Sequence, residues 1–148
     1  MNWVKAINLG EAEIQGVDLK TLLRFRGIGF FTAQGEILRP IDLTPNSSRY
    51  NSLIPGKPRY SGLFKIQTDD FPWNAFLQYR FAGGALLYSD SEEELSFQEC
   101  IDAGISLPIY QSLVFSLGVQ NLLDKNLEDV AGYPLPGRTF SSELKLKI

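Results

Sequence analysis

The chain has 148 residues, a formal net charge of −3 at pH 7, no histidine and a single cysteine, Cys100. The slight negative charge offers no basic field that would attract nucleic acid. The missing histidines exclude Ser–His and Cys–His nucleophile pairs and any Cys/His metal constellation, and one cysteine cannot close a disulfide within the chain. We therefore expect no enzyme of these kinds, no disulfide scaffold and no cofactor.

Hydropathy sets further limits. No apolar run approaches the roughly 20 residues that a membrane helix needs, and residues 1–15 contain no continuous apolar stretch of the kind found in a secretory signal. The mean hydropathy of −0.07 fits a soluble protein. It fits a transmembrane barrel equally well, because half of each barrel strand faces water or a polar interior. Abundant aromatic residues and glycines favour strands and tight turns over helices.

The first predicted element is a hairpin over residues 12–39. Apolar and polar residues alternate along its outgoing strand, and this period of two is typical of a β-strand with two different faces. We expect the outgoing strand over residues 12–25, a tight turn at Arg26-Gly27, and a return strand that ends at about Arg39.

The same alternation predicts two further hairpins and a final single strand. Cys100 lies on the polar side of its strand, where we expect it to be a small inward-facing side chain. Glu99 is the only charge on the apolar side of that strand. The expected strands cover residues 60–67 and 73–88, with a turn at 69–72, then residues 95–107 and 113–120, with a turn at 108–111, and finally residues 139–148.

The connections alternate in length. The three turns inside the hairpins are short, whereas residues 42–58, 89–94 and 121–137 form longer segments rich in Pro, Asn, Ser, Gly and acidic residues. An up-and-down meander with one tight end and one elaborate end is typical of outer-membrane barrels. The sequence therefore predicts an all-β, antiparallel meander of about seven strands.

Two architectures fit this meander. In a soluble, lipocalin-like binding module, the apolar face would surround an interior cavity. In a transmembrane wall, the apolar face would meet lipid and the polar face would meet the interior. The polar face carries Lys, Arg, Asp and Gln in mid-strand, which favours the wall. Seven strands would leave two open edges, and such edges are not tolerated in lipid, so we expect one arc of a larger barrel.

Two motifs resemble TonB-dependent outer-membrane receptors, a family in which an Asn-Leu-(Leu or Phe)-Asp-Lys segment ends a strand and Pro-Gly-Arg with an aromatic residue opens the last one. Near the N-terminus, residues 8–18 resemble the family's Asn-x-Gly-x-Ala-x-Ile-x-Gly-Val-Glu segment, with Asp18 in place of Glu and with Gly16 at a bulge or close backbone contact. The residues of the C-terminal motif are Asn121, Leu122, Leu123, Asp124, Lys125, Gly132, Tyr133, Pro134, Pro136, Gly137, Arg138 and Phe140.

The resemblance implies what the chain is part of. Residues 1–148 would be the last seven strands of a 22-stranded barrel in the outer membrane of a Gram-negative-type bacterium, without a counterpart of the signal peptide or the plug domain. The family usually ends in an aromatic residue, whereas this chain ends in Ile148. The whole receptor would import an iron–siderophore or cobalamin-like ligand, and the segment alone would be incompetent in transport. Its expected partners are lipid, lipopolysaccharide and the remaining barrel and plug, with TonB reached only through the N-terminal region.

Four residues on or beside the predicted long loops are candidate ligand contacts, through hydrogen bonds or stacking: Arg49, Tyr50, Tyr88 and Tyr133. Acidic pairs such as Asp69-Asp70 and the run 92–94 are expected to be solvated loop residues or a divalent-cation contact near lipopolysaccharide. Nothing converges on them, so we expect no catalytic activity. The receptor motifs also argue against a simple passive pore.

Overall fold

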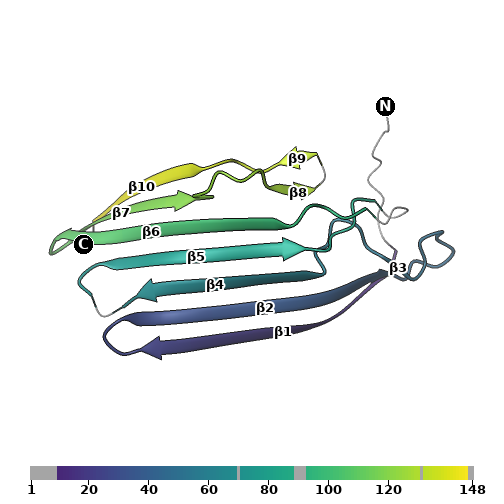
Figure 1. The fold of residues 1–148 in the computed structure, drawn as a ribbon, viewed down its shortest axis with the longest axis horizontal. Helices are drawn as coiled ribbons and strands as arrows, with labels where there is room; N and C mark the ends of the chain where they lie inside the picture. Colours follow the sequence, from purple (N-terminus) through teal and green to yellow (C-terminus); the bar gives the residue numbers. More distant parts are fainter. Residues whose placement is uncertain (1–9, 70, 89–92, 131, 147–148) are drawn as a thin grey trace.

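The computed structural model describes residues 10–69, 71–88, 93–130 and 132–146. Seven long strands form one antiparallel, open meander in the order β1-β2-β4-β5-β6-β7-β10 (Figure 1). The prediction of an all-β meander of about seven strands is confirmed. The strands are β1 Ala12–Phe25, β2 Gly29–Asp42, β4 Tyr60–Thr68, β5 Asn74–Gly83, β6 Gln98–Tyr110, β7 Leu113–Gln120 and β10 Thr139–Leu146.

Three short strands lie in the long connections. β3 (Ser52–Leu53) pairs with the end of β2, and β8 (Glu128–Val130) pairs with β9 (Tyr133–Pro134) in a small hairpin between β7 and β10. All three long connections leave the same end of the sheet, which we call the long-loop end, and the short turns lie at the opposite, tight-turn end (Figure 1). Within the part of the chain that the structure describes, no helix is long and apolar enough to cross a membrane.

Several strand boundaries differ from those that the alternation predicts. β5 ends at Gly83 because Gly84 adopts a positive φ of 72°, which turns the chain out of the sheet. Leu86 and Leu87 therefore leave the strand, and Leu86 forms an isolated bridge with Glu94. β6 correspondingly begins at residue 98 instead of 95.

The last tight turn is shorter than expected. β6 continues to Tyr110, and its pairing with β7 shifts between Pro108 and Tyr110. Because of the extra residue at this β-bulge, part of the predicted turn at residues 108–111 belongs to β6 instead. Some sequence interpretations concern residues outside the described ranges: the missing secretory signal within residues 1–9, Asp70, Glu92 and the terminal Ile148.

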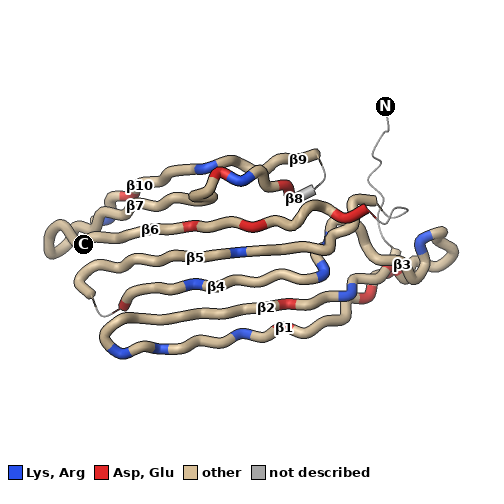
Figure 2. Tube along the Cα trace, viewed as in Figure 1, with Lys and Arg blue, Asp and Glu red and all other residues tan. Residues whose placement is uncertain are grey.

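The register gives the sheet two chemically different faces, because paired residues share a face and neighbours along a strand alternate between faces. Charged residues recur along the strands and are not confined to the loops (Figure 2). We call one side the apolar face; it includes Val17, Leu19, Leu23, Phe31, Ile37, Phe64, Ile66, Leu77, Tyr79, Phe81, Ile101, Ile105, Leu117, Phe140, Leu144 and Leu146. The other is the polar face; it includes Asp18, Lys20, Gln34, Glu36, Ser61, Lys65, Gln78, Arg80, Cys100, Asp102, Ser106, Ser116, Gln120, Ser141, Glu143 and Lys145.

The apolar face has no second layer over it. Leu19 is 70% exposed and Phe140 is 74% exposed, and among the described residues the buried hydrophobic side chains are limited to Ile41, Ala85 and Cys100, with Pro40 also fully buried. A lipocalin-like module would enclose its apolar side chains inside a closed barrel, whereas the described strands form an open sheet with these side chains outside.

A row of aromatic rings, stacked at first and then tilted, crosses the apolar face from β2 to the segment before β6. Phe31 stacks on Phe64 with 6.4 Å between ring centroids, and Phe64 stacks on Tyr79 at 6.5 Å. Phe81 continues the row to Phe97 at 6.1 Å. Such cross-strand aromatic pairs stabilise a sheet and fix its register.

Glycine is required where β2 begins. Gly29 has a φ of 141°, and a Cβ atom there would lie 2.7 Å from the Cα of Thr68 on the neighbouring strand. We predict that Gly29→Ala lowers the unfolding free energy of the full chain in detergent micelles by about 2–3 kcal/mol, because strained backbone and overlap must both be accommodated. Urea unfolding followed by tryptophan fluorescence measures this change.

Gly35→Ala is the matched control, because Gly35 lies in the same strand and on the same face, and a Cβ atom there would have nothing within 4 Å of it. Its urea midpoint should equal that of the unaltered chain. Equal midpoints for both variants would show that the close approach between β2 and β4 is not real.

Candidate functional site on the polar face

A buried carboxylate organises the polar face where β5, β6 and β7 meet. Asp102 of β6 is only 6% exposed. Its Oδ2 accepts a hydrogen bond from Nε of Arg80 at 2.9 Å and forms an ion pair with Nη2 of the same guanidinium at 2.8 Å, and it accepts a longer hydrogen bond from the Gln78 amide at 3.3 Å. Its Oδ1 accepts from the Cys100 thiol at 3.2 Å and from the backbone N–H of Asn121 at 3.0 Å. The charge is thus both paired and fully hydrogen-bonded, as burial requires.

Asn121 converts the end of β7 into a turn. It has a φ of 52°, in the left-handed region that asparagine tolerates better than most residues. Its side chain accepts a hydrogen bond from the Lys125 N–H at 2.9 Å and donates one to the Lys125 carbonyl at 2.8 Å. Asn121, the first residue of the C-terminal motif, therefore closes residues 121–125 into a turn, as the sequence predicts for an asparagine at a strand end.

Asp124 links the two halves of the C-terminal motif. It also has a positive φ, 54°, and its Oδ1 accepts from the Arg138 N–H at 2.8 Å, while the two side chains form an ion pair at 3.7 Å. A Cβ atom at Gly137 would lie 2.8 Å from the same oxygen, so only glycine fits without displacing the carboxylate. The motif residues thus fix where the loop leaves β7 and where it enters β10.

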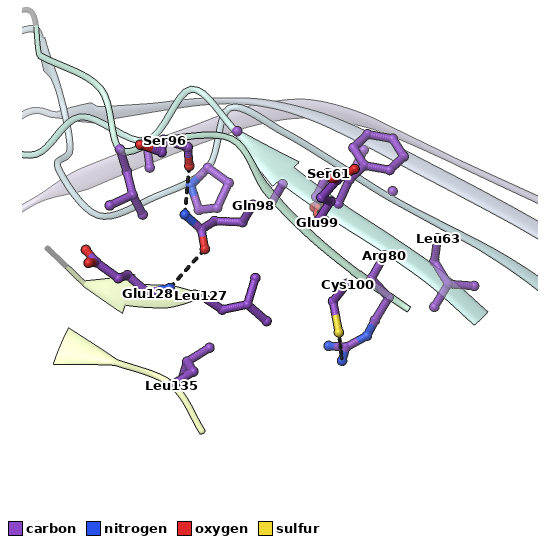
Figure 3. Close-up of a pocket in the computed structure, with 18 of the residues that line it drawn as sticks. Ser61, Leu63, Arg80, Ser96, Gln98, Glu99, Cys100, Leu127, Glu128 and Leu135 are labelled. Carbon is purple, nitrogen blue, oxygen red and sulfur yellow. Dashed lines mark hydrogen bonds between the residues drawn. The ribbon is translucent and has the colours of Figure 1, made fainter. Parts of the chain in front are cut away.

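The β8–β9 hairpin bends over the polar face and creates a hollow of about 430 Å³, which we call the loop-end groove. In Figure 3, Leu127 and Leu135 lie on the hairpin side of the groove, and Arg80 and Cys100 lie on the sheet side. The Glu128 N–H donates to the Gln98 Oε1 at 2.9 Å, which ties the hairpin to the start of β6.

The groove lining combines apolar walls with fixed polar groups. Ser61 donates to Glu36 at 3.3 Å, and Gln98 donates to the Ser96 carbonyl at 2.8 Å. Arg80 stays half exposed while its ion pair with Asp102 holds it in place. The groove thus presents preset hydrogen-bonding groups to any molecule that enters it. Across the described ranges, no three or more His, Cys, Asp or Glu side chains are grouped to hold a metal ion.

A second, more polar hollow of about 550 Å³ lies further towards the tight-turn end, over β6, β7 and β10. Ser106 and Ser116 share a hydrogen bond of 2.8 Å across its floor, and Ser141 and Glu143 line its far side. Lys65 lies over the Phe76 ring, 5.0 Å from its centroid, at the opposite side. Small and polar residues here leave room for groups that approach the sheet from its polar side.

The apolar face also carries charged residues near the long-loop end. Glu99 lies near the start of β6, at the long-loop end, and accepts a hydrogen bond from the Tyr79 hydroxyl at 3.0 Å. Lys125 forms an ion pair with it at 3.2 Å. The sequence shows the charge but not its two partners, which come from a neighbouring strand and from the loop after β7.

The four ligand contacts predicted from the sequence lie in three separate loops at the long-loop end. Arg49 is half-buried between β2 and β3, where its backbone N–H donates to the Ser47 hydroxyl at 3.1 Å. Tyr50, Tyr88 and Tyr133 are exposed. The residues that line the loop-end groove include none of these four.

Sequence reasoning missed the groove residues. Glu36, Ser61, Arg80 and Gln98 belong to four different strands that become neighbours only through the register. Their one visible signal is that each occupies a polar position in an alternating strand. Glu128 gave no signal, because it reaches the groove through a loop that folds back.

Comparison with known proteins shows the class of fold. No family model matches the chain. The copper transporter OprC superposes with a TM-score of 0.73 at 17% sequence identity, over 91% of this chain and 24% of that chain. A mutant of the ferric enterobactin receptor PfeA from Pseudomonas aeruginosa superposes with a TM-score of 0.70 at 17% identity, over 94% of this chain and 23% of that chain.

The chain therefore has the fold of an arc of a TonB-dependent receptor barrel, as the resemblance in its motifs predicts. It spans about a quarter of the length of these two solved chains.

Removing the Asp102 side chain should lower the unfolding free energy more than removing any other polar side chain. We predict that Asp102→Ala lowers the unfolding free energy of the full chain by about 2–4 kcal/mol, because the Arg80 guanidinium and the Asn121 N–H lose their acceptor. Urea titration in micelles, monitored by circular dichroism, measures the loss, and Asp102→Asn should lose less because it retains one acceptor oxygen.

The control is Asp69→Ala, which removes an exposed ion pair with Arg24 at 3.3 Å. Exposed pairs contribute at most about 1 kcal/mol, so its unfolding midpoint should move little. If Asp69→Ala lowers the unfolding free energy as much as Asp102→Ala does, the contacts of Asp102 with Arg80 and the Asn121 N–H are not what stabilises the start of the loop.

Proposed function

We propose that this chain forms part of the wall of a TonB-dependent transporter in the bacterial outer membrane. The observation that carries the proposal is the uncovered apolar face, with side chains such as Leu19 and Phe140 about three-quarters exposed on a sheet whose other face is polar. Burial of apolar area is worth roughly 25 cal/mol per Å². So many exposed apolar side chains are stable only against an apolar phase, and membrane hydrocarbon supplies one without a second protein layer.

The polar face then lines the barrel interior. Its paired charges, serines and two hollows suit a surface that stays hydrated or meets a polar plug domain. The ion pair and hydrogen bonds around Asp102 hold this wall in one conformation, so that an occupant of the barrel meets preset groups. The chain itself performs no covalent chemistry in this role.

The cargo proposed is an iron–siderophore complex or a cobalamin-like ligand. The name of PfeA, a ferric enterobactin receptor, supports the siderophore, and the cobalamin-like ligand is proposed from the motif resemblance alone. The long-loop end would face the outside, so Arg49, Tyr50, Tyr88 and Tyr133 would meet the ligand there. Partners would be lipid, lipopolysaccharide, the remaining barrel and plug, and TonB through an N-terminal region, with residues 1–148 as a C-terminal portion that is not competent alone.

Two neighbouring positions on β7 test the assignment of the faces. Ser116 lies on the polar face and Leu117 on the apolar face. In a Cys100→Ser background, we predict that a spin label at Leu117→Cys in phospholipid vesicles is relaxed mainly by oxygen, which concentrates in hydrocarbon. A label at Ser116→Cys should be relaxed mainly by a water-soluble nickel chelate.

Accessibility measured by electron paramagnetic resonance should therefore reverse between the two adjacent residues. The same pattern at both positions, or a stable monomer that remains in aqueous buffer with the Leu117 label hidden from both reagents, would overturn the proposed wall.

A further inference from the structure

The loop-end groove lies where all three long connections of the chain meet. Its walls include Gly56 and Pro58 from the first connection, Ala85 and Leu95 from the second, and Leu127 and Leu135 from the third. A hollow of about 430 Å³ can hold a small molecule or part of a larger one, since ligand pockets commonly measure about 300–1,000 Å³. The groove therefore has the size and the position of a ligand subsite, separate from the four loop residues predicted from the sequence.

Hydrogen bonds between and within the connections hold the groove in shape. The Gly56 N–H donates to the Leu86 carbonyl at 2.9 Å, which joins the first connection to the second. The Leu135 N–H donates to the Leu127 carbonyl at 2.8 Å and closes the hairpin that forms the opposite wall. A ligand that enters such a preformed groove loses little free energy to ordering the protein around it.

The positive charge at the groove is already neutralised. Among the described residues that line the groove, Arg80 is the only cation, and Asp102 engages its guanidinium through an ion pair at 2.8 Å and a hydrogen bond at 2.9 Å. Arginine recognises an anion best when its charge and its paired N–H donors are both available. A negatively charged group in the groove would therefore meet no uncompensated positive partner among these residues.

Two carboxylates line the groove from different walls. Glu36 on β2 accepts a hydrogen bond from the Ser61 hydroxyl at 3.3 Å, and Glu128 on the hairpin accepts one from the Gly132 N–H at 3.2 Å. Within the described ranges, neither forms an ion pair with Lys or Arg. Glu99 also borders the groove, but its side chain belongs to the apolar face of the sheet. The uncompensated charge that faces the groove is therefore negative.

The rest of the lining is largely apolar. Leu127 and Leu135 lie on the hairpin side of the groove, across from the residues of the sheet (Figure 3). Leu63 and Ala82 add apolar surface on the polar face of the sheet itself. Walls of this kind favour a ligand with an apolar body, because its entry removes apolar surface from water on both sides.

We propose that the loop-end groove binds an amphipathic ligand, which turns an apolar body to the leucines and a hydrogen-bond-donating, preferably cationic, group to Glu36 and Glu128. A ligand that turns an anionic surface to this wall does not fit. The inference rests on the proposed function, because it names the chemical class of the molecule that this part of a transporter wall would contact.

Protection of an engineered thiol measures binding to the full chain. In a Cys100→Ser background, Ala82→Cys places a thiol on the floor of the groove between Ser61 and Gln98, and Ser116→Cys places one in the second hollow as the control. The sheet under the groove consists of β2, β4, β5 and β6, each of which has both neighbouring strands within this chain. Micelles of an uncharged maltoside detergent, which cover the apolar face, should therefore preserve the groove.

Three probes share one apolar body and differ in one group: phenylbutylamine, phenylbutanol and phenylbutyrate. Each is titrated at neutral pH while iodoacetamide alkylates the thiol, and the free probe concentration is measured by dialysis. We expect the amine to protect Ala82→Cys with an apparent Kd about ten-fold or more below that of phenylbutyrate, because hydrogen bonds to charged groups are the stronger ones. The alcohol should lie between them, and no probe should change the alkylation rate of Ser116→Cys.

Neutral variants test the two carboxylates. With Glu36→Gln and Glu128→Gln combined, the apparent Kd of the amine should come within about two-fold of that of the alcohol, because the charge-assisted hydrogen bonds are lost. Glu143→Gln is the matched control, since it removes a carboxylate from the polar face outside the groove. It should leave the preference for the amine unchanged.

The outcomes separate this inference from the proposed function. Binding of phenylbutyrate as tight as that of the amine, no protection by any probe, equal protection of both thiols, or a preference that survives the double variant would each overturn the inference and leave the lipid-facing assignment intact. If the proposed function is wrong instead, the spin labels at Ser116 and Leu117 fail to reverse their accessibility, whereas the groove still selects the amine.

Discussion

The structure depends on one constraint: a single pleated layer must satisfy its backbone hydrogen bonds while its two faces meet different surroundings. Strand alternation gives the sheet an apolar face and a polar face. The described part of the chain leaves the apolar face uncovered and covers the polar face only at the long-loop end, where the β8–β9 hairpin bends over it. In the proposed membrane wall, hydrocarbon against one face and a polar interior against the other would resolve this conflict without further protein.

The polar face is more than a hydrophilic surface. Asp102 connects three strands, because it binds Arg80 of β5 from its place on β6 and accepts the N–H of Asn121 at the end of β7. From there Asn121 shapes the loop, and Asp124 returns the chain to β10 through Arg138. The motif residues that suggested the family are therefore mechanical parts that position a loop over the groove.

Sequence alternation is sufficient to predict the strands and their faces, because a period of two is a local property. It misses features that depend on contacts between distant segments. Gly84 ends β5 early through its positive φ, and the bulge near Pro108 shortens a turn. The loop-end groove was not foreseen, because Gln98 and Glu128 meet only after the β8–β9 hairpin folds back. The four loop residues chosen for their chemistry lie apart from that groove and stay predictions.

Polarised infrared spectroscopy of the full chain in oriented phospholipid bilayers tests the central claim most directly, because amide I dichroism reports the angle of the strands to the bilayer normal. A membrane wall of this type requires strands tilted by roughly 35–45°. Strands ordered at such an angle are the predicted result. Strands that lie flat in the bilayer plane, or a signal without orientation from protein left in the water phase, would contradict the account of a sheet that spans hydrocarbon.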